Sequence, residues 1–227
     1  MILYKIELKT EVTCVNELLF FLQILLSLLF TLGALRLGKE ALITNSAFQA
    51  LFANLFLLKQ IGLFGLEVTA SDGFAVGCLL SLNLLREFYG RESADKSIQI
   101  SFFCLLFFAL FSQLHLFYEP SRGDTAHGVY VALFSPAPRL FLSSLFTFWL
   151  VQRFDLWLFE KLSGSFVWKN GVCLMLSLAL DTLVFTFLGL YGLVPSLGNI
   201  LLFSFCVKAL SLATFLPFTR GLKSAPV

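Results

Sequence analysis

Seven predominantly apolar stretches follow one another along this chain, separated by short polar connections. A helix needs about 20 apolar residues to cross the hydrocarbon core of a bilayer. The stretches cover residues 15–35, 41–58, 73–89, 98–118, 138–160, 170–191 and 197–219. The second is short and contains polar residues, so six spans with a tilted or re-entrant second segment are the alternative to seven. The sequence therefore predicts an all-α fold, a polytopic transmembrane helix bundle of six or seven spans.

The composition agrees with a membrane domain and leaves no room for a soluble one. Of the 227 residues, 58% are hydrophobic and 13% are charged, whereas about a quarter of a soluble domain is charged. The apolar run Leu18–Leu35 is longer than the core of a signal peptide and no A-x-A site follows it, so we expect a retained helix. We therefore expect a single membrane domain over residues 1–227, with the lipid bilayer as its surroundings.

The charge balance and the absence of motifs argue against several other functions. A formal net charge of +2 is too small to indicate binding to nucleic acid. The five cysteines lack CxxC or His/Cys ligand spacing, so we expect buried free thiols, no metal site and no cofactor. Neither G-x-S-x-G nor H-E-x-x-H occurs, and both histidines flank one predicted outer loop, so we do not expect an enzyme.

Lysine and arginine are distributed unevenly between the two predicted sides of the membrane. The connections after the first, third and fifth stretches, with the C-terminal end, hold ten: Arg36, Lys39, Arg86, Arg91, Lys96, Arg153, Lys161, Lys169, Arg220 and Lys223. The opposite side holds four: Lys5, Lys9, Lys59 and Arg122. Because cytoplasmic loops carry the excess of Lys and Arg, this bias predicts a cytoplasmic C-terminus and, with seven spans, an outer N-terminus.

Four of the ionisable residues in the apolar stretches are candidates for a buried polar site: Glu87, Arg139, Asp181 and Lys208. A charge in hydrocarbon costs a few kcal/mol, so such residues usually face the protein interior and mark a solute or ion path. Asp181 lies 11 residues into its stretch, near mid-depth, as does Lys208. A buried Asp181–Lys208 pair that only holds helices together is the alternative, but desolvation makes such a pair a poor stabiliser. For Glu87 the alternative is pairing with a neighbouring arginine at a helix end.

Polar residues recur at helical spacing beside these charges. Ser143 follows Arg139 by four residues, and Ser177 precedes Asp181 by four, so each pair shares a helix face. Proline is favoured in the first turn of a helix, so we expect the fifth helix to begin at Pro138. Arg139 then lies at a helix N-terminus, where a cation is disfavoured and a carbonyl or anionic partner is expected.

The second and third stretches carry small residues on one face. Gly73, Gly77 and Ser81 recur at intervals of four, which allows a neighbouring helix to approach closely. Asn54 lies on a similar small-residue face. Lys59, just beyond it, is placed to extend towards the lipid headgroups.

From residue 37 onwards the sequence resembles the queuosine precursor transporter family, a set of small integral membrane proteins. The first group of matching residues is Leu37-Gly-Lys-Glu-Ala41, Ala53-Asn54 with Lys59, Phe64-Gly-Leu-Glu-Val-Thr69 and Asn83-Leu-Leu-Arg-Glu87-Phe-Tyr89-Gly90-Arg91. The second is Pro138-Arg139, Ser143, Ser144, Gln152, Asp155, Phe159, Asp181-Thr-Leu183, Lys208 and Phe215-Leu-Pro217. The resemblance implies a transporter core at 37–220, preceded by an extra N-terminal helix at 1–36.

The resemblance implies import of a purine-like small molecule across the cell inner membrane, a 7-deazaguanine base (queuine, preQ1 or preQ0) that serves tRNA modification. The substrate-binding residues it suggests are Asn54, Asn83, Glu87, Arg139, Asp181 and Lys208. The supporting residues are Lys59, Ser143, Gln152, Asp155 and Ser177. The chain departs from the family at Asn83, where an aspartate is usual, and at Val76, where a proline is frequent; the asparagine removes a negative charge next to Glu87.

The chemistry of these residues suits a guanine-like edge. Such an edge presents N1–H and a 2-amino group, two parallel donors that a carboxylate such as Asp181 or Glu87 accepts, while O6 needs a donor such as Lys208, Arg139 or Asn54. Transport by facilitated diffusion and ion-coupled alternating access both fit. The alternative function is a substrate-binding subunit of an ATPase-driven vitamin-type importer; no P-loop occurs here, so another chain would supply energy. The sequence leaves homo-oligomerisation open.

Overall fold

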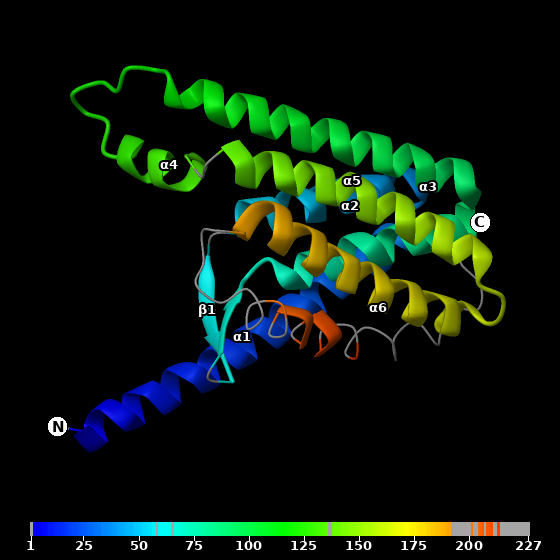
Figure 1. Cartoon of the computed structure of the whole chain (residues 1–227), viewed down its shortest axis with the longest axis horizontal. Helices are drawn as coiled ribbons and strands as arrows, with labels where there is room; N and C mark the ends of the chain where they lie inside the picture. Colours follow the sequence, from blue (N-terminus) through cyan, green and yellow to red (C-terminus); the bar gives the residue numbers. More distant parts are fainter. Residues whose placement is uncertain are drawn as a thin grey trace.

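The computed structural model describes residues 2–57, 59–64, 66–135 and 138–191, together with 201, 204–206, 208–210 and 213. The helices are α1 (Ile2–Leu37), α2 (Lys39–Leu55), α3 (Asp72–Leu116), α4 (His127–Phe134), α5 (Pro138–Lys161) and α6 (Phe166–Phe185), which continues into a π-helical turn η1 (Thr186–Leu190). The predicted helix bundle is confirmed (Figure 1). Most of the predicted seventh span, 197–219, and the C-terminal end lie outside the described residues, although the described positions from 201 to 213 are helical.

Helix α3 contains two of the predicted spans, joined at a single glycine. Gly90 has φ 81° and ψ 174° inside an otherwise helical segment, a conformation that a residue with a Cβ rarely adopts. The chain reverses there, so that the second half of α3 runs back along the bundle (Figure 1). The reversal is why one helical element accounts for the stretches at 73–89 and 98–118.

Three helices of the described part of the chain are long and apolar enough to cross a membrane: Val15–Leu37, Asp72–Leu116 and Phe166–Gly189. Helix α2 has 17 residues, which matches the shortness noted in the sequence. Helix α5 has 24 residues but carries Gln152, Arg153 and Asp155 in its second half, which lowers its hydropathy. The chain is therefore a multi-pass membrane protein.

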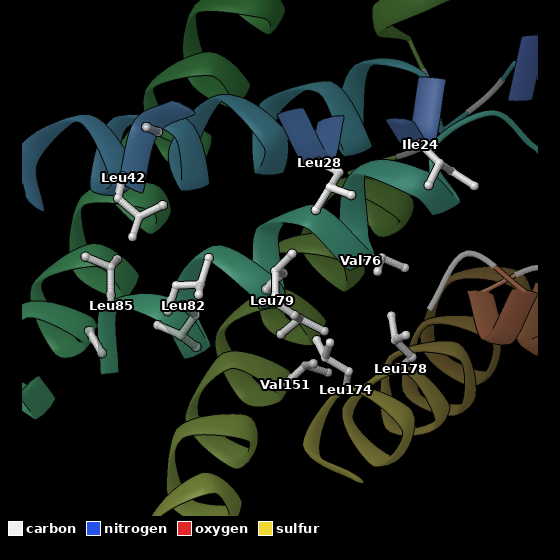
Figure 2. Close-up of a cluster of buried hydrophobic side chains, with 14 of the residues drawn as sticks. Ile24, Leu28, Leu42, Val76, Leu79, Leu82, Leu85, Val151, Leu174 and Leu178 are labelled. Carbon is white, nitrogen blue, oxygen red and sulfur yellow. The ribbon is translucent and has the colours of Figure 1, made fainter. Parts of the chain in front are cut away.

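The first half of α3 is the central helix of the bundle. Figure 2 shows its Val76, Leu79, Leu82 and Leu85 meeting Ile24 and Leu28 of α1, Leu42 of α2, Val151 of α5, and Leu174 and Leu178 of α6. Lipid tails are as apolar as leucine, so the hydrophobic effect does not drive helices together inside a bilayer, and close van der Waals packing holds them instead. The predicted small-residue stripe serves this packing: a Cβ on Gly77 would lie 2.5 Å from the Ser27 Oγ of α1.

A short antiparallel hairpin between α2 and α3 was not predicted from the sequence. Strand β1 (Gln60–Leu63) pairs with β2 (Leu66–Thr69), and Gln60 lies opposite Thr69. The Asn16 side chain of α1 donates to the Gly62 carbonyl at 3.1 Å, and the backbone N–H of Phe64 donates to Glu17 at 2.9 Å. These contacts fix the hairpin at the end of the bundle that also holds the α3–α4 connection (Figure 1).

Candidate functional site: a polar cavity closed at one end

A cavity of about 400 Å³ lies between α2, α3, α5, α6 and the hairpin, within the size range of small-molecule sites. Its wall is polar at many positions: Asn54, Gln60, Thr69, Ser71, Asp72, Ser144, Thr147, Gln152, Asp181, Thr182, Thr186, Ser204 and Lys208. Phe148 and Phe185 supply aromatic surface. The cavity extends from the hairpin to Gln152, which is roughly 18 Å along α5 from Leu140 at 1.5 Å per residue.

A lysine between two carboxylates forms the ionic centre of the cavity. Lys208 Nζ lies 2.6 Å from Asp181 Oδ2 and 3.6 Å from Asp72 Oδ1, and it also donates to Thr182 Oγ1 at 3.1 Å. The Lys208 and Asp72 side chains are 6% and 5% exposed, whereas Asp181 is 27% exposed. If all three groups are ionised, the triad carries one net negative charge, and Asp181 presents it to the cavity.

Asp72 is the member of this triad that the sequence analysis missed. It lies in the first turn of α3, where an acidic residue is ordinary because it complements the helix dipole. Here it is buried instead, and Ser204 donates to it at 3.3 Å. The signal that was available is its position immediately before the Gly73–Gly77 stripe, which brings this end of α3 against neighbouring helices.

Two amide side chains complete the polar wall. The Asn54 Nδ2 donates to the Ala50 carbonyl at 3.0 Å, and its Oδ1 accepts from Ser144 across to α5. Gln152, 3% exposed, donates to the Cys78 sulfur at 3.1 Å. Four predicted site residues therefore line the cavity: Asn54, Gln152, Asp181 and Lys208.

Three more predicted residues lie just beyond the cavity, in a buried polar layer between α3, α5 and α6. Ser177 donates to Asp155 Oδ1 at 2.6 Å, and Asn83 donates to Asn170 Oδ1 at 3.0 Å. All four side chains are at most 1% exposed. None of them is among the residues that line the cavity.

A network of ion pairs occupies the next layer, at the end of the bundle away from the hairpin. Glu160 of α5 accepts from Arg86 and from Arg91, each at 3.2 Å, and Asp95 pairs with Arg153. Glu87 belongs to this layer, where its carboxylate lies 3.0 Å from Lys169 Nζ of α6. Glu87 thus has an ion-pair partner at the helix end, although this partner is Lys169 and not the neighbouring arginine of the alternative interpretation, and Glu87 lies outside the cavity wall.

The remaining predicted residues lie apart from the cavity wall. Helix α5 begins at Pro138, as predicted, and Arg139 donates to the Leu188 carbonyl of η1 at 2.8 Å while staying exposed. That carbonyl belongs to the last turn of a helix, where orphan acceptors and a negative dipole end favour a cation. Ser143 is buried on α5 outside the lining residues, and Lys59 is exposed beside the hairpin.

The comparison with protein families gives one match across most of the chain. A model described as "Putative vitamin uptake transporter" matches residues 74–221. The chain belongs to this family. The matched region holds α4, α5, α6, nearly all of α3 and the Asp181–Lys208 pair, whereas Asp72 and Asn54 precede it.

A relative of this chain carries a more specific name. The "Probable queuosine precursor transporter" of Bacillus subtilis (strain 168) is 28% identical over 165 residues, which are 70% of this chain and 72% of the relative. The resemblance stated from the sequence is thereby confirmed. No solved structure matches the chain.

Proposed function

We propose that this protein imports a queuosine precursor, a 7-deazaguanine base, across the cell inner membrane for use in tRNA modification. The observation that carries the proposal is the Asp72–Lys208–Asp181 triad in the wall of a cavity of about 400 Å³. The name of the Bacillus subtilis relative supports the substrate class. A triad that only joined helices would not need its Asp181 carboxylate to face an open cavity.

The cavity offers complementary groups to each part of such a base. The partly exposed Asp181 carboxylate is placed to accept the parallel N1–H and 2-amino donors of a guanine-like edge. Gln152 and Lys208 are donors for O6, while Phe148 and Phe185 offer aromatic faces to the flat bicycle. Buried Asp72 is the second carboxylate that holds Lys208 in place.

The net negative charge of the triad favours a base that carries an amine. preQ1 and queuine have such an amine and preQ0, with a nitrile in its place, does not. Because a cation near a buried carboxylate gains a charge-assisted hydrogen bond, we expect preQ1 and queuine to bind more tightly than preQ0 or guanine.

The arrangement along the bundle axis suggests the direction of transport. The ends of α1 and α5 and the Gly90 reversal carry most of the lysine and arginine, which by the positive-inside rule favours a cytoplasmic location for that end. The cavity reaches the hairpin end, and the ion pairs around Glu160 close the other. We infer an outward-open state in alternating access, with the C-terminus in the cytoplasm.

Uptake by purified protein in liposomes tests the substrate. Labelled queuine should enter liposomes that contain the protein and not empty ones. An excess of unlabelled queuine or preQ1 should abolish uptake of the label. The same concentration of preQ0 or guanine should compete about tenfold less well, because a tenfold difference in affinity corresponds to ~1.4 kcal/mol, about the value of one charge-assisted contact. Uptake no faster than into empty liposomes would refute the proposal.

Removal of the closing ion pairs should open the cytoplasmic end. In a variant whose only cysteine is the buried Cys173, Glu160→Ala removes the acceptor shared by Arg86 and Arg91. We expect a membrane-impermeant thiol reagent applied from the cytoplasmic side to label Cys173 several-fold faster, because the inward-open state gains population. The matched control Glu92→Ala changes an exposed glutamate on the same side and should leave the labelling rate of Cys173 unaltered. Equal labelling rates for Glu160→Ala and Glu92→Ala would contradict a gate at Glu160.

A further inference from the structure

A buried carboxylate without a cationic partner lies between the cavity and the closing ion pairs. Asp155 of α5 is 0% exposed. Its Oδ1 accepts from Ser177 at 2.6 Å, and no side chain or backbone group in the described ranges donates to its Oδ2. Among the residues that the structure describes, no lysine or arginine forms an ion pair with it.

The groups that face Asp155 from the neighbouring helices are neutral. They are the amide of Asn83 and the thiol of Cys78 on α3, and the thiol of Cys173 on α6. The nearest cations along the helices are engaged elsewhere, Arg153 with Asp95 and Lys169 with Glu87. An ionised carboxylate buried among neutral groups is strongly disfavoured, so this environment favours a carboxyl group that carries a proton.

The amide of Asn83 lies beside Asp155 but makes its hydrogen bond to Asn170 Oδ1, at 3.0 Å. Within the described part of the chain, Asp155 Oδ2 therefore remains without a donor. A buried acceptor without a donor is costly, and more so when it carries a charge, so a proton on Oδ2 relieves this site.

The position of this layer suits an ion that moves with the substrate. Along α5, Asp155 lies three residues beyond Gln152 of the cavity wall and five before Glu160 of the closing ion pairs. Along α6, Ser177 lies four residues before Asp181. A helix turn therefore separates the Asp155 layer from the substrate site on one side, and from the closed end on the other.

We propose that Asp155 binds the proton whose inward movement drives uptake. This inference rests on the proposed function and adds to it the coupling ion and its site. The proton enters from the outer solution through the cavity and forms an O–H bond at Asp155 Oδ2. It leaves to the cytoplasmic solution once the ion pairs around Glu160 open, so that one proton crosses with each substrate molecule and no other bond is made or broken.

Gradient-driven uptake tests the coupling. Liposomes with the membrane potential clamped at zero and the outside one pH unit more acidic should accumulate labelled queuine about tenfold, because one pH unit of proton gradient is worth ~1.4 kcal/mol. Asp155→Asn should accumulate none above equilibrium, yet still exchange internal labelled queuine for external unlabelled queuine. The control Glu92→Gln, an exposed carboxyl on α3, should accumulate as the unaltered protein does.

Infrared spectroscopy tests the protonated carboxyl directly and without transport. The unaltered protein in detergent at neutral pH should show the C=O stretch of a protonated carboxylic acid, and Asp155→Asn, checked as monodisperse, should lose that band while Glu92→Gln keeps it. A band that survives in Asp155→Asn would overturn the site. Queuine accumulation that ignores the pH gradient, or follows a sodium gradient instead, would overturn the coupling. A complete lack of queuine exchange by the unaltered protein would refute the proposed function itself.

Discussion

Lys208→Met is expected to lower the initial rate of queuine uptake about a hundredfold. The substitution keeps much of the side-chain volume but leaves Asp72 and Asp181 together in a buried site without their shared cation. Removal of one partner of a buried ion pair costs about 3–5 kcal/mol. If the lower end of this cost, ~3 kcal/mol, falls on the substrate-binding arrangement of the site, it corresponds to roughly a hundredfold. The measurement is uptake into liposomes, normalised to the amount of protein incorporated.

Two further variants separate the loss of the site from a loss of folding. Lys59→Met removes an exposed lysine at the hairpin and should transport normally. The double variant Asp72→Asn with Lys208→Met removes one negative charge along with the positive one, so it should recover thermal stability in detergent without recovering uptake. Normal uptake per molecule by Lys208→Met would exclude the triad from the transport site.

Gly77→Ala is expected to destabilise the bundle by about 3 kcal/mol. The added Cβ would lie 2.5 Å from Ser27 Oγ and 2.6 Å from Gln49 Cδ. Gln49 cannot move freely, because it accepts from Ser27 at 2.6 Å and donates to Thr31 at 2.9 Å. Overpacking of this kind costs typically 1–3 kcal/mol, and a displaced buried hydrogen bond adds to it; the thermal unfolding midpoint in detergent measures the sum.

Gly33→Ala is the matched control for this substitution. Gly33 lies inside α1, and a Cβ there would meet no atom within 4 Å. Alanine is favoured over glycine within a helix, so this variant should unfold at the same temperature as the unaltered protein or slightly higher. Equal midpoints for Gly77→Ala and Gly33→Ala would contradict the close approach of α3 to α1 and α2.

The sequence predicted those features that depend on local chemistry. The apolar stretches located helices α1, α2, α5 and α6 and both halves of α3, and the proline preference located the start of α5 at Pro138. The rarity of charges in apolar helices singled out Asp181 and Lys208, which do meet across two segments 27 residues apart. In each case the physical constraint acts on a residue and its immediate neighbours along the chain.

The features that could not be predicted from the sequence depend on how the helices rotate about their axes and approach one another. Glu87 and Arg139 lie in apolar stretches just as Asp181 does. In the structure, however, the Glu87 side chain pairs with Lys169 and the Arg139 side chain donates to the Leu188 carbonyl. Asp72 could not be distinguished from an ordinary acid in a first helical turn. The reversal at Gly90 has no local signal beyond a glycine, because its φ of 81° follows from the packing of the two halves of α3.

Equilibrium binding of labelled queuine to the purified protein in detergent tests the central claim most directly. We expect saturable binding of labelled queuine to the unaltered protein and to Glu92→Gln. Asp181→Asn should bind queuine at least tenfold more weakly, because the amide cannot accept both donors of the base edge. Lys208 keeps its other carboxylate partner, Asp72, so the site should stay folded. Unchanged affinity in Asp181→Asn, at a normal unfolding temperature, would show that the substrate binds elsewhere.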